Sequence, residues 1–329
     1  MDVLRNLRNA LVPALWTPNY NQALVSYRNL NQKYKLNNTL KLLLAAFILL
    51  ALSKAGFASC LQFSSNQLVS FSTTSGQYNP QHHIAWHEVK QVVDGDTIQL
   101  ADGQFARLLG INTPEIGRYK RSKSDKFMYK PDQPLAQEAR NVLVKLLQPK
   151  RVGLVFPHGV KRDKYHRLLA LAVNTKQQFV NVLLISEGLA WYIAMEPRTA
   201  SYKAHYEDNY IPCLQIAEQQ AKAEKLGIWS QRIYQPVHAT ASKLKPGFQE
   251  ITGLIQNINQ TTRYTWINLQ GAVVLRLDKP VFTLRKGAIM QKYASKQKIT
   301  ARGWLIARRK AKKYKPFMMP VKHQAMLFL

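Results

Sequence analysis

Strand-like runs joined by tight turns constrain the fold of the central part of this chain. Residues 87–93 alternate loosely between polar and apolar side chains, and an Asp-Gly-Asp turn at 94–96 interrupts them. The strand pattern then resumes, turns once more and returns over 104–111, before Pro114 ends it. Because Asp-Gly turns connect antiparallel strands and proline cannot donate to a strand ladder, this order predicts a β-meander.

Helical and strand-like patterns follow one another along the rest of the segment 86–235. They predict a helix at 134–148, strands at 152–156 and 167–173, and helices at 180–190 and 202–226. A fold that is mainly β with α (α+β) follows from this order. The loop 116–133 carries many lysines and arginines. It is either a solvated loop or, because it lies next to Glu115, a clamp for a polyanion.

Five ordered blocks of residues lie within 87–230. They read Val-Asp-Gly-Asp-Thr at 93–97, Arg-Leu-Leu-Gly-Ile-Asn-Thr-Pro-Glu at 107–115, Asp-Lys-Tyr-His-Arg at 163–167, Val-Asn…Leu…Gly-Leu-Ala within 180–190, and Ala…Lys-Leu-Gly-Ile-Trp within 221–229. Their content and order resemble the staphylococcal nuclease, or thermonuclease, family. The resemblance implies a five-stranded OB-fold barrel with helices packed on it.

The same blocks contain groups that suit phosphodiester hydrolysis. An anionic electrophile needs charge neutralisation, an activated water and stabilisation of the developing phosphorane. Asp96 is a hard oxygen ligand of the kind that Ca²⁺ or Mg²⁺ takes, and Glu115 follows a strand end where a general base could act. Taken singly, an Asp-Gly-Asp turn and a loop glutamate are usually structural; their combination with two arginines favours catalysis.

The resemblance implies a role for eight residues. It places Asp96, Asn112 and the carbonyl of Thr113 around calcium, Glu115 beside the attacking water, Arg107 and Arg167 on the phosphate, and Lys164 and Tyr165 at the phosphate end of the nucleotide. The implied activity is metal-dependent cleavage of single-stranded DNA and RNA, with little sequence preference, leaving 3′-phosphates.

Asn112 departs from the family pattern, in which a second calcium-binding aspartate stands at this position. One fewer negative ligand predicts weaker Ca²⁺ binding or a shift towards Mg²⁺ or Mn²⁺. An alternative function stays open: a non-catalytic protein on the same fold that binds nucleic acid without cutting it. The presence of Asp96, Arg107, Glu115 and Arg167 favours the enzyme over this alternative.

The C-terminal part, residues 246–329, follows a predicted linker at 236–245. Its patterns predict strands at 251–258, 264–269, 273–277, 299–307 and 318–326, with a short helix at 287–296. Five strands with a helix between the third and fourth fit a second, small OB-like barrel, which we expect to be a basic accessory domain. Its cationic tip at 308–315 predicts a nucleic-acid clamp. Tyr264, Trp266 and Trp304 are either core residues or stacking platforms for bases, and core is the preferred interpretation.

The N-terminal segment, residues 1–60, is predicted to direct export. Residues 42–52 form an uncharged apolar run of 11 residues, preceded by lysines and an arginine. A membrane-spanning helix needs about 20 such residues, whereas the core of a signal peptide needs about 7–15. Small residues lead up to Ala58, as at a signal peptidase site. We therefore expect a periplasmic or extracellular protein.

Cys60 leaves two forms of the exported protein open. Ala58-Ser59-Cys60 also resembles a lipoprotein cleavage site, and a lipidated Cys60 would tether the chain to a membrane. Without a lipid, Cys60 would be able to pair with Cys213. Residues 61–85, rich in Ser, Gln, Asn and Thr, are expected to form a flexible spacer.

The charge balance indicates the class of partner. A net charge of +29 makes polyanions the leading partners, and single-stranded DNA and RNA are the ones we expect. Two cysteines exclude a disulfide-stapled scaffold or a Cys-rich zinc module. No Gly-rich phosphate loop, Gly-x-Ser-x-Gly or His-Glu-x-x-His motif is present. We expect the protein to act as a monomer.

Overall fold

The computed structural model describes residues 84–121, 127–156, 162–194, 211–278, 296–308 and 314–328. Several predictions therefore lie outside the described residues. They are the export segment at 1–60 with Cys60, nearly all of the spacer, the start of the helix at 202–226, nearly all of the helix at 287–296, and residues 309–313 of the basic tip. None of the described helices is long and apolar enough to cross a membrane.

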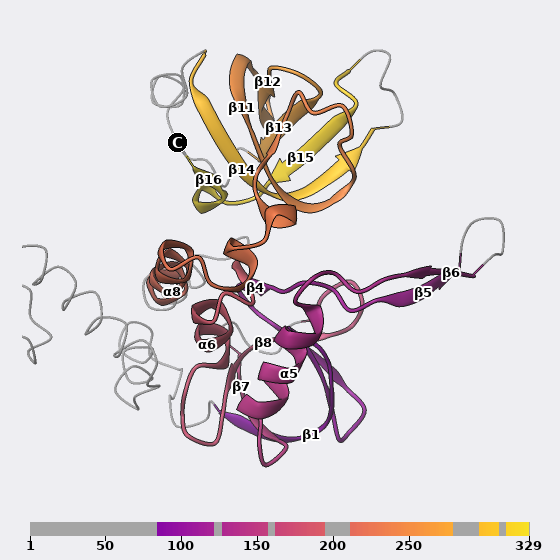
Figure 1. Ribbon diagram of the computed structural model, residues 1–329, viewed down its shortest axis with the longest axis vertical. Helices are drawn as coiled ribbons and strands as arrows, with labels where there is room; N and C mark the ends of the chain where they lie inside the picture. Colours follow the sequence, from indigo (N-terminus) through magenta and orange to yellow (C-terminus); the bar gives the residue numbers. More distant parts are fainter. Residues whose placement is uncertain are drawn as a thin grey trace, which may run out of the picture.

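Five strands close into the first barrel (Figure 1). They are β1 (Ala85–Asp94), β2 (Thr97–Leu100), β3 (Phe105–Leu108), β7 (Arg151–Val155) and β8 (Leu168–Val173). The order around the barrel is β1-β2-β3-β8-β7, and β7 pairs back onto β1. Strands β3 and β8 run parallel, and the other neighbours run antiparallel. The predicted meander and the OB-type barrel are confirmed.

The third strand of the meander is shorter than its pattern predicted. It ends at Leu108, and Gly110 adopts a left-handed conformation with a φ of 75°. Glycine reaches this region without a steric penalty, so the chain turns out of the barrel there. Residues Ile111–Asn112 then form β4, which pairs with β9 (Trp191–Tyr192).

Three described helices accompany this barrel. They are α5 (Ala136–Leu146), α6 (Val180–Ser186) and α8 (Ile211–Ala223). Helix α6 is shorter than predicted because Gly188, at a φ of 67°, packs against the backbone of Leu226 and Gly227. A β-carbon there would collide with that backbone, so the close approach of the two segments requires glycine.

The basic loop predicted at 116–133 contains a β-hairpin. Strands β5 (Arg118–Arg121) and β6 (Phe127–Lys130) pair in register and project away from the barrel (Figure 1). The rings of Tyr119 and Tyr129 face each other across the strands with centroids 5.1 Å apart. Such cross-strand aromatic pairs stabilise a β-hairpin.

A second five-stranded ring follows in the C-terminal part. Its strands are β11 (Gly247–Gln260), β12 (Tyr264–Leu269), β13 (Val273–Asp278), β14 (Lys298–Ala307) and β15 (Phe317–Val321). They pair in the order β11-β12-β13-β15-β14, and β14 returns to β11. Strands β13 and β15 run parallel, so this ring repeats the connectivity of the first barrel. The second OB-like barrel is confirmed.

Two short strands extend the second barrel. In the predicted linker, β10 (Val237–His238) pairs in parallel with β11. The last predicted strand ends at Val321, and the chain continues through the 3-10 turn η5 (Gln324–Met326) to β16 (Leu327–Phe328), which pairs with β14.

The interpretation of three aromatic residues as core was wrong. Trp304 is 49% exposed, and Tyr264 and Trp266 are half-buried on the outer face of β12. Their strand neighbours Thr265 and Ile267 point into the barrel instead. Because successive side chains of a strand face opposite sides, the register of β12 decided the outcome.

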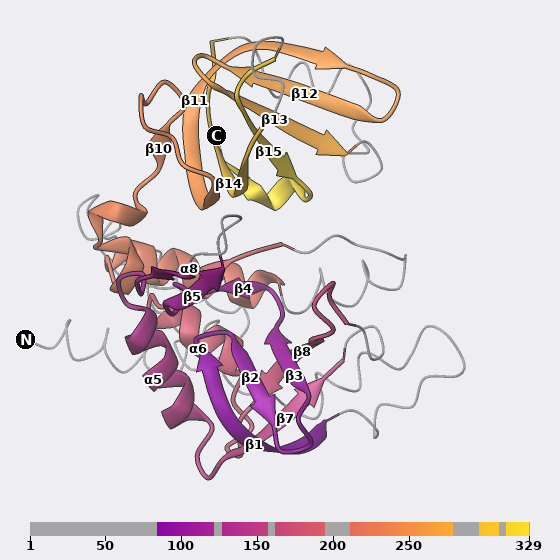
Figure 2. The ribbon, with the colours of Figure 1, turned by 90° about the vertical axis from the view of Figure 1, so that its right-hand side faces the viewer.

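A buried arginine joins the two barrels, and α8 lies between them (Figures 1 and 2). Arg302 on β14 donates through Nη1 to both carboxylate oxygens of Glu218 on α8, at 2.7 and 2.9 Å, and to the carbonyl of Tyr192 at 2.7 Å. Its Nε and Nη2 donate to Oε1 of Glu250 on β11, at 2.9 and 2.7 Å. Burial opposes the charge of Arg302, but the two carboxylates hold its pKa above the ordinary value.

Candidate active site

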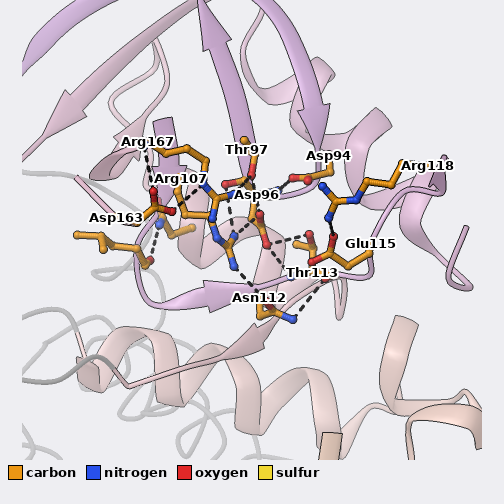
Figure 3. Close-up of polar contacts among 12 residues, drawn as sticks. Asp94, Asp96, Thr97, Arg107, Asn112, Thr113, Glu115, Arg118, Asp163 and Arg167 are labelled. Atoms are coloured by element: carbon orange, nitrogen blue, oxygen red, sulfur yellow. Dashed lines mark hydrogen bonds and ion pairs between the residues drawn. The ribbon is translucent and has the colours of Figure 1, made fainter. Parts of the chain in front are cut away.

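The predicted site residues come from one end of the first barrel (Figure 3). Asp96 lies in the turn between β1 and β2, Arg107 on β3 and Asn112 on β4. Arg167 directly precedes β8, which pairs with β3. The barrel topology therefore brings together residues that the sequence separates by as many as 71 positions, as between Asp96 and Arg167.

Asp96 is the centre of the polar network. Its carboxylate is 5% exposed and forms an ion pair with Arg107 through Oδ1. Oδ2 accepts hydrogen bonds from the backbone N–H of Thr113 at 2.9 Å and from its hydroxyl at 3.1 Å. Oδ1 also accepts from the hydroxyl of Thr97 at 3.0 Å. These contacts fix both carboxylate oxygens.

The turn that carries Asp96 is packed against a helix. A β-carbon at Gly95 would collide with Ala139 of α5 and with Thr113, so this position needs glycine. Asp94, at the start of the turn, accepts a hydrogen bond from the backbone N–H of Asp96 at 3.1 Å. Burial raises the pKa of Asp94, although the charge of Arg107 counteracts it.

Asn112 meets Arg107 inside the site. Its Oδ1 accepts a hydrogen bond of 3.0 Å from Nη2 of Arg107, and its side chain is nearly fully buried. Nδ2 donates to the carbonyl of Thr113 at 3.5 Å. Burial lowers the pKa of Arg107 to about 10, so its guanidinium remains charged at neutral pH.

Arg167 is held by two residues whose importance the sequence analysis missed. Its Nε pairs with Oδ2 of Asp163 at 2.8 Å, and its Nη1 donates to the hydroxyl of Thr97 at 3.2 Å. Burial opposes the ionisation of Asp163, but hydrogen bonds from the backbone and side chain of Arg167 keep its pKa below the usual range. Asp163 also accepts from the backbone N–H of Tyr165 at 2.8 Å, an aspartate turn that the Asp-Lys-Tyr-His-Arg block could have indicated.

Glu115 lies at the exposed side of the cluster of site residues. Its carboxylate accepts from Nη2 of Arg118 on the β5–β6 hairpin at 2.9 Å, and its backbone N–H donates to Gln133 at 2.8 Å. The side chain of Glu115 is 39% exposed, so water reaches it. In the sequence, Arg118 is only one of the many cations of this loop.

Lys164 and Tyr165 lie at the rim of the site. The ring of Tyr165 is 66% exposed and lies beside Arg167, with the guanidinium carbon 5.5 Å from the ring centroid. Nζ of Lys164 lies 4.9 Å from the same centroid. The structure thus places Tyr165 next to the second arginine, and Lys164 next to Tyr165.

The oxygen atoms at this end suit a hard cation. Asp94 and Asp96 supply carboxylates, Asn112 an amide oxygen and Thr113 a carbonyl, which are the ligand types of Ca²⁺ and Mg²⁺. Among the described residues, no group of three or more His, Cys, Asp or Glu side chains is placed to hold a metal ion. A cation here would therefore rely on neutral oxygens as well as carboxylates.

Comparison with known proteins places the chain in a family. Residues 106–231 match the family described as "Staphylococcal nuclease homologue". Endonuclease YncB of Bacillus subtilis (strain 168) is 30% identical over 184 residues, which cover 50% of this chain and 77% of that protein. The chain belongs to the staphylococcal nuclease family. The resemblance predicted from the five blocks is thereby confirmed.

Other family members match over a similar stretch. The SPbeta prophage-derived endonuclease YokF of the same Bacillus subtilis strain is 34% identical over 150 residues, 44% of each chain. The probable endonuclease LCL3 of Verticillium alfalfae (strain VaMs.102 / ATCC MYA-4576 / FGSC 10136) is 32% identical over 149 residues, 44% of this chain and 45% of that protein. The chain thus spans about half the length of these two relatives, and more of YncB.

Proposed function

We propose that this protein is a metal-dependent endonuclease that hydrolyses single-stranded DNA and RNA with little sequence preference and leaves 3′-phosphates. The observation that carries the proposal is the convergence of two arginines on one turn. Arg107 pairs with Asp96 and Arg167 contacts Thr97, so a guanidinium group from β3 and one from just before β8 meet at one end of the barrel. Relatives that are named endonucleases support the same activity.

Different residues of the site would bind the phosphate, accept the proton of the water and position the groups that do so. Arg107 and Arg167 donate hydrogen bonds to the non-bridging phosphate oxygens, where charge increases in the transition state. Glu115 accepts a proton from the attacking water, whose oxygen bonds to phosphorus as the bond to the 5′-oxygen breaks. The leaving oxygen takes a proton from solvent. Asp163 keeps Arg167 in position through its ion pair.

Calcium is the metal ion that we propose, held by Asp96, Asn112 and Thr113. A bound cation would neutralise phosphate charge and make a bound water easier to deprotonate. The neutral amide of Asn112 makes Mg²⁺ and Mn²⁺ the alternatives to test. Lys164 and Tyr165 would contact the phosphate end of the nucleotide, since Tyr165 borders Arg167 and Lys164 lies over the ring of Tyr165.

One observation favours a second candidate, a nucleic-acid-binding protein without nuclease activity. The amide of Asn112 already accepts from Arg107 and donates to the carbonyl of Thr113, and Asp96 pairs with Arg107. All three ligand positions proposed for the metal are therefore engaged with each other or with an arginine. Such a site would still attract phosphates through Arg107 and Arg167.

We also propose that the protein is exported to the periplasm or the medium and acts there as a monomer. The apolar run at 42–52 supports export. A lipid attached to Cys60 would tether the exported protein to a membrane. The alternative partner of Cys60, Cys213, lies half-buried on α8. Mass spectrometry of the exported chain would show either a lipid on Cys60 or its absence.

The proposed activity is tested by cleavage of end-labelled single-stranded DNA and RNA with Ca²⁺, Mg²⁺, Mn²⁺ or EDTA. We expect metal-dependent cleavage whose products carry phosphatase-sensitive 3′ ends. In the matched variant Glu115→Gln, loss of the general base should lower kcat by about 10²- to 10⁴-fold. Salt-sensitive binding without cleavage under any metal would instead support the second candidate.

The variant Asn112→Asp tests the metal site directly. A carboxylate in place of the amide adds a negative ligand, so we expect Ca²⁺ binding to tighten by at least about tenfold, or ~1.4 kcal/mol. Calorimetric titration with Ca²⁺ measures the change, and Asn141→Asp, at an exposed position on α5, serves as the control. An unchanged Ca²⁺ affinity would show that residue 112 does not hold the cation.

A further inference from the structure

The outer face of the second barrel carries a row of aromatic rings and guanidinium groups. Arg276 on β13 lies over the ring of Tyr264, with 4.8 Å from its guanidinium carbon to the ring centroid. The centroids of Tyr264 and Trp266, both on β12, are 5.7 Å apart. Arg308, at the end of β14, lies 6.0 Å from the centroid of Trp266 and 4.6 Å from that of Tyr314. These five residues are called the cation–aromatic row below.

The row is accessible from outside the barrel. Tyr314 is 47% exposed, and Tyr264 and Trp266 are half-buried, each covered in part by a neighbouring ring or guanidinium group. Three asparagines extend the same face, because Asn259 pairs with Trp266 in the strand register and Asn257 pairs with Asn268. The surface therefore combines flat rings, positive charge and amide groups.

The charge of this barrel points to an anionic ligand. Residues 246–329 contain two acidic residues, Glu250 and Asp278, against sixteen lysines and arginines. Glu250 is buried against Arg302, and Asp278 pairs with Arg276 at 3.4 Å. Arg308 has no ion pair within the described part of the chain, so it is available for a phosphate.

We propose that the cation–aromatic row is a binding surface for single-stranded nucleic acid, separate from the candidate active site. Strands β12 and β13 are the second and third strands of an OB-fold barrel, the face on which such barrels take oligonucleotides. Unpaired bases stack on the rings of Tyr264, Trp266 and Tyr314, and phosphates pair with the arginines. Since every base has a π face, this binding is independent of sequence.

The proposal goes beyond the proposed function, although it rests on the same class of substrate. The row lies on a different barrel from Asp96, Arg107 and Arg167. Its role is to hold a long strand while the first barrel acts on one phosphodiester of it. A long substrate would therefore bind more tightly than a dinucleotide, which engages one barrel at a time.

The first test measures the binding of the full chain to labelled oligothymidylate of about 15 nucleotides, within the roughly 4–16 nucleotides that one OB fold covers. Fluorescence anisotropy is recorded in EDTA, which removes the metal needed for cleavage. Trp266→Ala should raise Kd roughly five- to hundredfold, the range found when one stacking platform is removed. Trp266→Phe retains a ring and should restore most of the affinity.

The matched control is Trp304→Ala. Trp304 belongs to the same barrel and is more exposed, but its ring contacts Phe248, with centroids 4.9 Å apart, outside the row. Its replacement should leave Kd unchanged. Tyr314→Ala removes an exposed ring of the row and should weaken binding as well, which keeps the test valid if Trp266→Ala fails to fold.

Salt dependence separates stacking from charge. Arg308→Gln should reduce the slope of log K against log salt by about 0.7, the value for one phosphate of a single strand. Trp266→Ala should lower the affinity without changing the slope. Heparin, a polyanion without bases, should bind Trp266→Ala as tightly as the unmodified protein.

Two results would overturn the proposal. One is equal oligothymidylate binding by Trp266→Ala, Tyr314→Ala and Trp304→Ala. The other is an equal loss of heparin and oligothymidylate binding in Trp266→Ala, which would reveal a site for polyanions in general. Failure of the nuclease proposal is a different outcome, because it appears as absent cleavage by the unmodified protein with every metal.

Discussion

Replacement of Arg167 by alanine is expected to lower kcat by about 10²- to 10³-fold, the usual effect of removing one donor aimed at developing charge. Arg167 is partly buried and fixed on two sides, by Asp163 at 2.8 Å and by Thr97 at 3.2 Å. A donor held in this way stabilises the transition state without having to reorganise, and Arg107 remains to bind the ground-state phosphate. The Kd for single-stranded DNA should therefore change little.

Single-turnover cleavage and anisotropy in EDTA measure the two quantities separately. Arg232→Ala, at an exposed position outside the polar network of the site, controls for the loss of one positive charge. Arg167→Lys keeps the charge but not the planar fork, so we expect it to recover only part of the rate. Equal losses of kcat and of affinity in Arg167→Ala would show that Arg167 is a binding group and not a transition-state donor.

Replacement of Arg302 by alanine is expected to lower the free energy of unfolding by about 3–5 kcal/mol, the cost of breaking a buried ion pair from one side. The side chain of Arg302 is completely buried and pairs with Glu218 and Glu250. Without it, two buried carboxylates face each other with no counter-charge, and the carbonyl of Tyr192 loses a donor. The two barrels should then separate or unfold more easily.

Urea unfolding of the full chain measures this loss. A triple variant, Arg302→Met with Glu218→Gln and Glu250→Leu, should recover most of the stability, since replacing a whole buried ion group is often neutral. Glutamine at 218 can still accept from the backbone N–H of Tyr192, which now donates to Glu218 at 2.7 Å. Arg232→Ala should stay within about 0.5 kcal/mol, as surface substitutions usually do. If Arg302→Ala lowered the free energy of unfolding as little as the control does, Arg302 would not be the residue that holds the barrels together.

Much of the first barrel could be predicted because the sequence patterns that indicate its strands and turns are local. Alternating residues, an Asp-Gly turn and Pro114 predicted the meander, and β1, β2 and β3 follow it closely. The end of β3 was misplaced, because the left-handed conformation of Gly110 depends on where β4 finds its partner in β9. That partner lies about 80 residues further along the chain, beyond the reach of a local pattern.

The candidate site was predictable in its central residues and not in those that support them. Asp96, Arg107 and Arg167 stand in blocks whose order is specific. Thr97 stands in the first block but received no role in the site, although its hydroxyl connects Asp96 to Arg167. Such a role arises only once β2 and the chain before β8 lie next to each other in the barrel.

The sequence by itself determined the family, the two successive barrel patterns and the large positive charge, because these depend on residue order, local periodicity and composition. Only the tertiary structure decided which aromatic side chains face outwards on β12, and that Arg302 lies buried between Glu218 and Glu250. A shift of one residue in strand register reverses the face of every side chain, and a buried charge is stable only beside its partners. Both outcomes therefore depend on contacts between segments that are far apart in the chain.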